Sequence, residues 1–504
     1  MPEHLRSLIV ILGLATVTML VAKKPSRPLM LADGDFERRR NLWFGITLAA
    51  FLAHNFWIFI LIAGVLLIRT SLQERDKIGM ALFVLLTVPV FDAEIPGFGL
   101  IRYLMNFHYL RLISIVVFLP ILIREIKKHS FQRFTNEAPD KFLYLYLILN
   151  IGLTFASSTF TVTGRAAVYA FIDIIVPYAV ASRLTNTVGA LRSAMAAYVL
   201  GASIMAVIGV FEYVKRWLLY DALDSALGVQ WGLGSYLLRG DSLRAVATAG
   251  QGIPFGLSMG VAFCLMLSLG HFFQRKFFWI IGLSVLALGL FSSVSRGPWL
   301  GTAIGLLAYF LTDRQKSRAV TYLCLGGVLL AIAAVATPLG EKMLFYMTVE
   351  DTLTYRRRLL DISTDLIFQY PFFGPPNYLQ APSMQQLIQG QGIIDIVNTY
   401  LAVALNSGLV GLSLFVSFFG SAMFLLWRRM ALAAKHDPDL HELGRGLLAA
   451  IVCTLVTIFT VSSISVIPWI YYLVAGLAVG YARMEHAQTE AFVPAHRPIF
   501  IVPH

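Results

Sequence analysis

The chain has 504 residues, of which 58% are hydrophobic and 13% are charged, and its formal net charge is +12. Soluble domains are about 45–50% apolar and about 25% charged, so this composition excludes an ordinary soluble protein and predicts a membrane protein. The basic residues are dispersed among loops rather than lined up on one soluble face. This excludes nucleic acid as a partner and makes anionic membrane lipids the expected one.

Apolar runs of about 17–25 residues are candidate membrane helices. The first three lie at 6–22, 42–68 and 78–93, where 42–68 is either one long span or two short ones. The later runs follow at 109–123, 141–157, 166–182, 190–213, 251–270, 276–292, 298–312, 319–337, 406–427, 446–466 and 468–484. We therefore predict an all-α bundle of about 11–14 spans, with residues 1–485 as a single integral membrane domain and 486–504 as a cytoplasmic tail.

Lysine and arginine in short loops indicate the cytoplasmic side. The densest basic loop is 123–141, and alternation from it also places the basic loops 271–276, 312–318 and 427–445 inside. The same alternation places the basic segment 23–40 outside, against the charge rule. Either the first run does not span, or 42–68 and 78–93 are broken or re-entrant.

Two long loops, about 214–250 and 338–397, fall outside, and long loops on one side of a bundle commonly carry function. In the second, a helix is predicted to begin at Thr352 or Thr354 and to run to about Tyr370, where Pro371 ends it. Its first turn would carry three consecutive arginines, namely Arg356, Arg357 and Arg358. A helix N-terminus and guanidinium groups both favour phosphate, although a lipid headgroup could occupy the same place.

Further arginines are predicted at the same face. Arg296 lies between two spans, where Gly297 and Pro298 would form a tight turn that fixes its direction. Arg239 and Arg244 precede the span 251–270. Arg239 could pair with the nearby Asp241, and no obvious local carboxylate partner is then expected for Arg244.

Few candidate bases lie near this face. Asp395 is three residues from Asn398, about one helical turn, so both side chains could point the same way. Asp395 could accept a proton from an attacking hydroxyl, or it could neutralise one of the arginines. His108 is also predicted outside, as interfacial packing. The sequence contains no Walker motif, no HExxH and no paired acidic motif, which argues against a nucleotide-driven pump or a metalloprotease.

Three stretches resemble the O-antigen ligase/polymerase superfamily: SVSRGPWLG (293–301), the run from Arg356 to Gly374, and NTYLAVALNSGLVGLSLF (398–415). In that family an arginine stands about eighteen residues before the glycine of a P-x-x-G element, which is the place of Arg356. In the family, an arginine-containing segment also leads into the span that precedes these motifs. LRAVATAGQGIPFG (243–256), which contains Arg244, is similar to that segment. The spacing from Arg239 to Gly250 also fits the Arg-x10-Gly pattern of polymerases.

The resemblance implies a GT-C-type glycosyltransferase of the bacterial inner membrane, acting at the periplasmic side without a metal or cofactor. Its substrates would be undecaprenyl-diphosphate-linked oligosaccharides, and a flippase and a chain-length regulator would be its partners. Arg244, Arg296 and Arg356 would hold the diphosphate and neutralise charge as the glycosidic bond breaks. Arg357 and Asn398 are also expected to bind the diphosphate. Arg239, Arg358 and Tyr400 are further candidates for the same site.

One position departs from the family pattern. Ligases have His-Asn before the Tyr-Leu element, and the His is thought to activate the acceptor hydroxyl, but this chain has Val397 before Asn398. Valine cannot accept a proton, so Asp395 is the replacement candidate. This favours a polymerase of repeat units over an O-antigen ligase acting on lipid A-core. A transporter of lipid-linked sugars is the third hypothesis, although the charges gather at one face and no repeated halves stand out.

Overall fold

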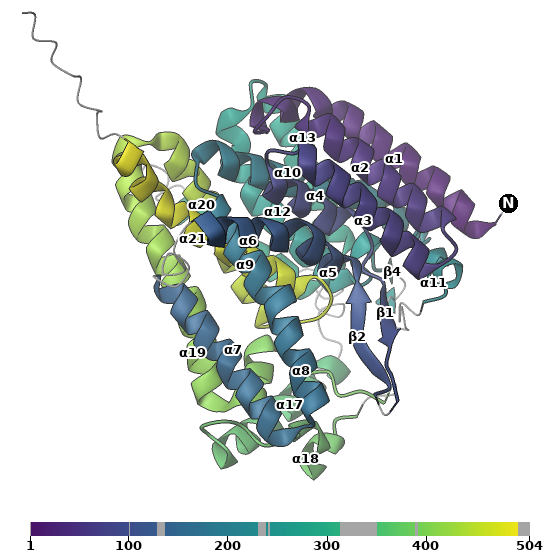
Figure 1. Cartoon of the computed structure of the whole chain (residues 1–504), viewed down its shortest axis with the longest axis vertical. Coiled ribbons are helices and arrows are strands. Elements are labelled where there is room, and N and C mark those ends of the chain that lie inside the picture. Colours follow the sequence, from purple (N-terminus) through teal and green to yellow (C-terminus); the bar gives the residue numbers. More distant parts are fainter. Residues whose placement is uncertain are drawn as a thin grey trace, which may run out of the picture.

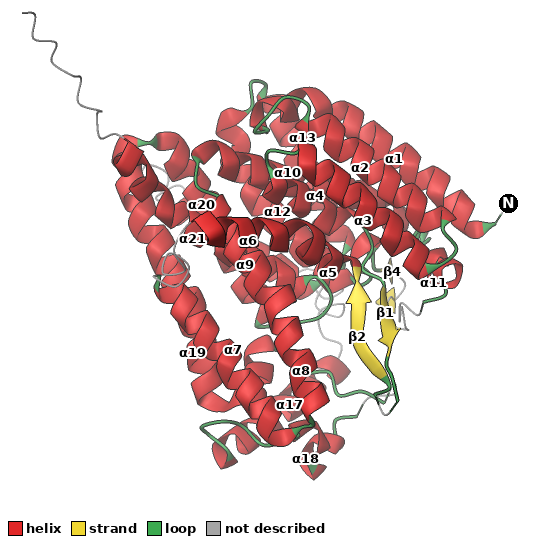
Figure 2. Ribbon diagram, viewed as in Figure 1, coloured by secondary structure: helices red, strands yellow, loops and turns green. Residues whose placement is uncertain are grey.

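The computed structural model describes residues 2–99, 101–128, 137–229, 238–239, 242–312, 350–388 and 392–491, and this part of the chain is almost entirely helical (Figure 2). Seven of the described helices are long and apolar enough to cross a membrane, and shorter apolar helices accompany them. The predicted all-α, polytopic membrane fold is confirmed. The predicted span 319–337 lies outside the described residues, and the total of 11–14 spans stays a prediction.

The longer helices, in chain order (Figure 1), are α1 (Glu3–Ser26), α2 (Asp35–Leu52), α3 (Phe56–Gln73), α4 (Lys77–Thr87), α5 (Tyr109–Ile113), α6 (Leu119–Lys128), α7 (Ala138–Ser157), α8 (Phe160–Tyr169), α9 (Val176–Leu184), α10 (Val188–Lys215), α11 (Ala222–Leu227), α12 (Gly252–Leu269), α13 (Lys276–Ser292), α14 (Arg296–Leu311), α17 (Glu350–Gln369), α18 (Pro382–Gln385), α19 (Thr399–His436), α20 (Pro438–Ile458) and α21 (Ile467–Ala491). The short π-helical segments are η2 (Ser114–Phe118) and η4 (Ala170–Ile175). The short 3-10 helices are η1 (Arg27–Leu29), η6 (Ala247–Ala249), η7 (Gly270–Phe272) and η8 (Tyr378–Gln380). Two small antiparallel hairpins, β1 (Asp92–Pro96) with β2 (Tyr103–His108) and β3 (Leu238–Arg239) with β4 (Ser242–Leu243), complete the elements of the described residues. The hairpins were not predicted. α21 continues six residues into the tail predicted from 486.

The apolar run 42–68 proves to be two helices, α2 and α3, and this removes the conflict over the basic segment 23–40. Asn55 ends the short connection between them by capping α3, because its side chain accepts the backbone N–H groups of Trp57 and Ile58. Because 42–68 is two helices, the chain crosses the bundle once more before the loop 123–141 than with a single span. The segment 23–40 therefore falls at the same end of the bundle as that loop. We call this the basic end.

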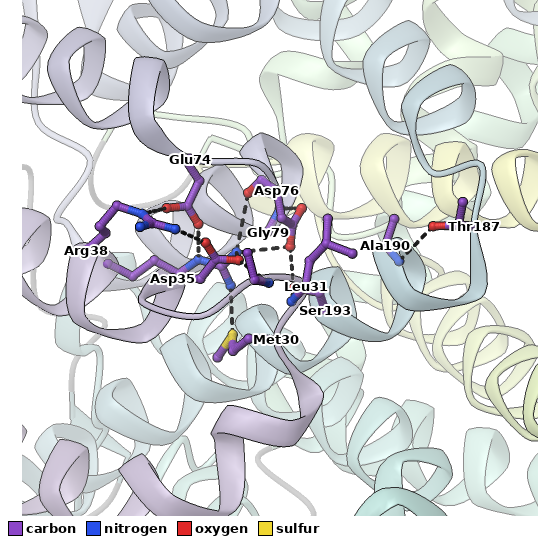
Figure 3. A network of polar contacts seen from close by, with 12 residues as sticks. Met30, Leu31, Asp35, Arg38, Glu74, Asp76, Gly79, Thr187, Ala190 and Ser193 are labelled. Atoms are coloured by element: carbon purple, nitrogen blue, oxygen red, sulfur yellow. Dashed lines mark hydrogen bonds and ion pairs between the residues drawn. The ribbon is translucent and has the colours of Figure 1, made fainter.

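Buried ion pairs tie the connections at the basic end together (Figure 3). Arg39 of α2 is 0% exposed and donates through Nε to Glu74 Oε1 at 2.8 Å and through Nη2 to Asp76 Oδ2 at 3.0 Å. Ser193, at the start of α10, donates to the same oxygen of Asp76 at 2.5 Å. A buried guanidinium is tolerated only with good partners, so these contacts clamp α2 to the α3–α4 connection and to α10.

The opposite end carries a second, smaller core beneath α17 and α18, which Figure 1 shows together near the far ends of α7, α8 and α19. Leu359, Leu366 and Ile367 of α17 are buried in it and Ile362 is half-buried, as the helical spacing predicts. The predicted start of this helix is wrong. α17 begins at Glu350, so the arginine triplet lies in its second turn and away from its exposed backbone N–H groups.

The P-x-x-G element Pro371–Gly374 docks onto a kink in α19 at Ser407–Gly408. The N–H of Leu409 donates to the carbonyl of Pro371 at 2.7 Å. Gly374 and Gly408 both have positive φ, and a Cβ on Gly408 would lie 2.2 Å from the carbonyl oxygen of Phe372. Only glycine allows the two backbones to approach this closely, and the contact fixes α17 against α19.

Candidate functional site

Arg244 is held against the turn between α13 and α14. Its Nη2 donates to Ser295 Oγ at 2.7 Å, and its Nε lies 3.4 Å from the carbonyl oxygen of Ser293. The neighbouring N–H of Ala245 donates to the carbonyl of Ser292 at 3.0 Å, so backbone and side chain are attached to the same turn. Ser295 immediately precedes Arg296, and the structure therefore brings Arg244 next to the start of α14.

Arg296 is the first residue of α14, and the predicted turn at Gly297 and Pro298 is wrong, because both residues are already helical. The turn is formed by Ser293–Ser295, where Val294 has a φ of 45°, and Pro298 is already helical. Gly297 lies directly against Thr460, since a Cβ there would be 2.2 Å from Thr460 Oγ1. This close approach places Arg296 beside the end of α20.

The segment 460–466, which joins α20 to α21, connects the parts of the site. Its sequence is TVSSISV, and we call it the 460–466 segment. Arg356 Nη2 donates to the carbonyl of Thr460 at 3.1 Å, and Ser462 Oγ donates to Asp395 Oδ1 at 2.6 Å. Thr399 Oγ1 donates to the carbonyl of Val461 at 2.8 Å. Helix α17 and the stretch from Asp395 to Thr399 are thus both anchored on one short polar connection.

Arg296 and Arg356 are close enough for their charges to interact. Partial desolvation lowers the pKa of Arg296, and the positive charge of Arg356 lowers it further. Partial desolvation also lowers the pKa of Arg356, while the negative charge of Asp395 raises it. Two guanidinium groups that disfavour each other's charge would be stabilised by an anion between them. The arrangement of Arg244, Arg296 and Arg356 at one end of the bundle therefore suits a diphosphate chemically.

Asp395 is positioned by α17 as well as by the 460–466 segment. The hydroxyl of Tyr355 donates to the backbone carbonyl of Asp395 at 2.9 Å. The expected shared helical face of Asp395 and Asn398 is wrong, because Asp395 precedes α19 in non-helical chain. Asn398 instead caps α19, and its Oδ1 accepts the N–H groups of Tyr400 and Leu401.

The remaining predicted residues are less directly involved. The hydroxyl of Tyr400 donates to the carbonyl of Leu455 at 3.2 Å, and its ring packs among Phe415 and Phe459. Arg357 and Arg358 are exposed on α17. Arg239 lies in the β3–β4 hairpin, and its side chain falls outside the described part of the structure.

Sequence reasoning missed the 460–466 segment because the apolar run 446–466 was read as one span, whereas α20 ends at Ile458. The alternating hydroxyl residues of TVSSIS were the available signal. Glu212 was also missed. It is buried within the apolar helix α10, and its carboxyl group accepts backbone N–H groups from the loop that carries Arg244.

Residues 281–416 match the family model described as O-antigen ligase. This stretch of the chain is therefore similar to the O-antigen ligase family. The match extends from α13 to the first half of α19 and contains Arg296, Arg356 and Asp395, and it supports the O-antigen ligase/polymerase superfamily that the sequence motifs predicted. Members of this family are membrane glycosyltransferase-like enzymes, and the family implies lipid-linked glycans as substrates. A comparison with curated proteins found no match.

Proposed function

We propose that the protein is a polysaccharide polymerase that joins undecaprenyl-diphosphate-linked repeat units at the periplasmic face of the bacterial inner membrane. The observation that carries the proposal is the convergence of Arg244, Arg296 and Arg356 with Asp395 around the 460–466 segment and the Ser293–Ser295 turn. Three cations and one carboxylate match the needs of a reaction whose leaving group is a diphosphate.

In the proposed reaction a sugar hydroxyl of one lipid-linked repeat unit attacks the anomeric carbon of a chain carried on another lipid. A new C–O bond forms, the bond from the anomeric carbon to the diphosphate oxygen breaks, and its electron pair leaves with undecaprenyl diphosphate. The attack comes from the opposite face, so the configuration inverts. Asp395 takes the hydroxyl proton, while the arginines stabilise the charge that develops on the leaving group. No metal is required in this scheme.

The second candidate is an O-antigen ligase, which the family match does not distinguish from a polymerase. A ligase would transfer the glycan from undecaprenyl diphosphate to lipid A-core. Val397 argues against a ligase, because it stands in the sequence position of the ligase histidine and its side chain packs against the small core beneath α17. A lipid-linked sugar transporter is a weaker third candidate, with no observation in its favour.

The test is transfer by the purified full-length protein in liposomes that contain lipid-linked repeat units and EDTA. Longer lipid-linked glycan should appear without any lipid A-core. Arg296→Ala and Arg356→Ala should each reduce the rate about 100-fold or more, the usual effect of removing one electrostatic group at a developing charge. Arg356→Lys should recover only part of the rate, because lysine retains the charge but loses the fork of donors. Asp395→Asn should abolish glycan transfer, because asparagine cannot accept the proton of the attacking hydroxyl.

Arg428→Ala is the matched control, since this arginine is exposed near the opposite end of α19. It should transfer as the wild type does. Transfer only after lipid A-core is added would identify a ligase, and loss of transfer in EDTA would contradict metal independence. Wild-type rates in both arginine-to-alanine variants would refute the proposed site.

A further inference from the structure

A cavity of about 430 Å³, with several polar side chains in a mainly apolar wall, is bounded by α5, α7, α8, η4 and the start of α21. Its volume falls within the ~300–1,000 Å³ of typical ligand pockets. Arg111 and Asp173 form an ion pair in its wall, with Nη2 and Oδ2 2.7 Å apart. Burying charged groups among membrane helices is expensive, so such groups point to function. We call this space the Arg111 cavity.

The charged and titratable groups of the Arg111 cavity compensate one another. Arg111 pairs with Asp173 and stacks on the ring of Tyr169, with its guanidinium carbon 3.7 Å from the ring centre. Desolvation and the charge of Arg111 lower the pKa of His108 to about 3, so the imidazole is neutral at physiological pH. The site of Arg244, Arg296 and Arg356, which we call the arginine site, is positively charged. The groups that line the Arg111 cavity carry no net charge, so a neutral ligand fits this cavity better than a diphosphate.

The polar groups of the wall suit hydroxyl groups. His108 Nδ1 accepts the N–H of Arg111, so the proton of the neutral ring is on Nε2, which is a donor. Asn150 uses its amide nitrogen on the carbonyl of Tyr146, which leaves its side-chain oxygen as an acceptor. Thr154 donates to the carbonyl of Asn150 and keeps two lone pairs. Sugar hydroxyls both donate and accept, and so match this mixture.

The flat aromatic side chains of the cavity supply the other half of sugar recognition. Tyr169, Trp469 and Tyr471 line it from two sides of the bundle. A pyranose ring has an apolar C–H face and a polar hydroxyl edge, and aromatic rings beside fixed hydrogen-bonding groups satisfy both. Binding sites of this kind combine apolar walls with a few placed polar groups.

A second cavity, of about 460 Å³, shares part of its wall with the first. Asn150 and Thr154 line both cavities, and the second extends along the end of α7 to the stretch 373–380 and to Asn406. The two cavities together have room for more than one sugar. They run from the start of α21 to the P-x-x-G element.

The 460–466 segment links the cavities to the arginine site. Thr460 accepts the hydrogen bond from Arg356, and Ser465 lines the Arg111 cavity. Five residues of extended chain span at most about 18 Å, which bounds the distance between the two backbone positions. One short segment of chain therefore connects the wall of the cavity to the residue that Arg356 contacts.

We propose that these two cavities form an acceptor-glycan subsite that binds the neutral sugars of the acceptor oligosaccharide, with Asn150 and Thr154 as the shared hydrogen-bonding wall. The assignment as acceptor side rests on the proposed transfer function. The recognition of a neutral glycan does not, since it follows from the groups that line the cavities.

The test measures equilibrium binding of the repeat-unit oligosaccharide, released from its lipid by mild acid, to the full-length protein in nanodiscs. Thr154→Val and Asn150→Leu, each close in shape to the native side chain, should weaken binding at least tenfold with unchanged melting temperatures. Thr18→Val is the matched control. Thr18 makes the same bond to the carbonyl four residues before it, but it lines a separate apolar cavity between α1 and α10. Arg356→Ala should also bind normally, because the probe has no diphosphate.

Wild-type affinity in both cavity variants, or no saturable binding by the wild type, would overturn the subsite. Transfer assays on the same preparations separate this failure from that of the proposed function. If transfer occurs while binding ignores the cavity variants, the subsite is wrong and the function stands. If binding depends on Asn150 and Thr154 but no transfer to any acceptor occurs, the subsite stands as a glycan site and the proposed function is wrong.

Discussion

Replacing Glu212 by glutamine should loosen the loop that carries Arg244. Glu212 is fully buried, and its Oε1 accepts the N–H of Leu219 at 3.1 Å. Its Oε2 accepts the N–H groups of Val246 and Ala247 at 3.1 and 2.8 Å. One carboxyl group therefore holds both ends of the loop between α10 and η6, and Arg244 is two residues before the nearer of these donors.

Glutamine has only one acceptor oxygen for these three donors. If that oxygen serves Val246 and Ala247, the amide nitrogen faces the N–H of Leu219, and an unsatisfied buried donor costs about 1–3 kcal/mol. The bonds from Val246 and Ala247 are kept, so the unsatisfied donor of Leu219 is the main loss. We expect the free energy of loop opening to fall by about 2 kcal/mol, or about 30-fold in the opening equilibrium.

Hydrogen exchange measured by mass spectrometry is the assay, on peptides that cover 217–222 and 243–250. Exchange in Glu212→Gln should be about 30-fold faster in both peptides, and transfer should fall because Arg244 is no longer fixed. Glu37→Gln is the control, since Glu37 pairs with Lys23 and Arg27 at the basic end. Unchanged exchange in 243–250, or equal acceleration in the control, would refute the role assigned to Glu212.

Three further changes test other parts of the structure. Gly408→Ala should destabilise the α19 kink by about 1–3 kcal/mol, because the φ of Gly408 is 62° and an added Cβ would meet the carbonyl of Phe372. Limited proteolysis of α17 should then be faster than in the wild type. Wild-type resistance to the protease would contradict the docking of Pro371–Gly374 on this kink. Arg39→Met should lower the free energy of unfolding by about 3–5 kcal/mol, because the buried Asp76 loses its ion-pair partner and Glu74 keeps only Arg38. The exposed Arg27→Met should cost at most about 1 kcal/mol. His108 has a folded pKa of about 3, below its unfolded value, so the unfolded state binds the extra proton and stability falls as pH drops from about 6.5. His108→Asn, which can still cap α5, should flatten that part of the pH–stability curve, and an unchanged slope would exclude His108 as its source.

The membrane fold was predictable because long apolar runs are a local property of the chain. The run 276–292 coincides with α13, and the buried face of α17 follows from the spacing of Leu359, Leu366 and Ile367. Arg244, Arg296 and Arg356 could also be placed at one end, since alternating spans fix the side of each loop. Helix boundaries were less predictable, and the run 42–68 left one long span and two short ones open until the structure placed the break before Asn55.

The sequence by itself determined the fold class, the end of the bundle at which the arginines lie, and the family motifs. Only the tertiary structure decided which residues share the site. Asp395 meets Ser462 across 67 positions of the chain, and Glu212 meets Ala247 across 35. Neither contact leaves a periodic signal, because a hydrogen bond depends on where helices pack and not on the spacing of neighbours. The same holds for the cavities along α7, whose walls come from helices that meet only when the bundle is assembled.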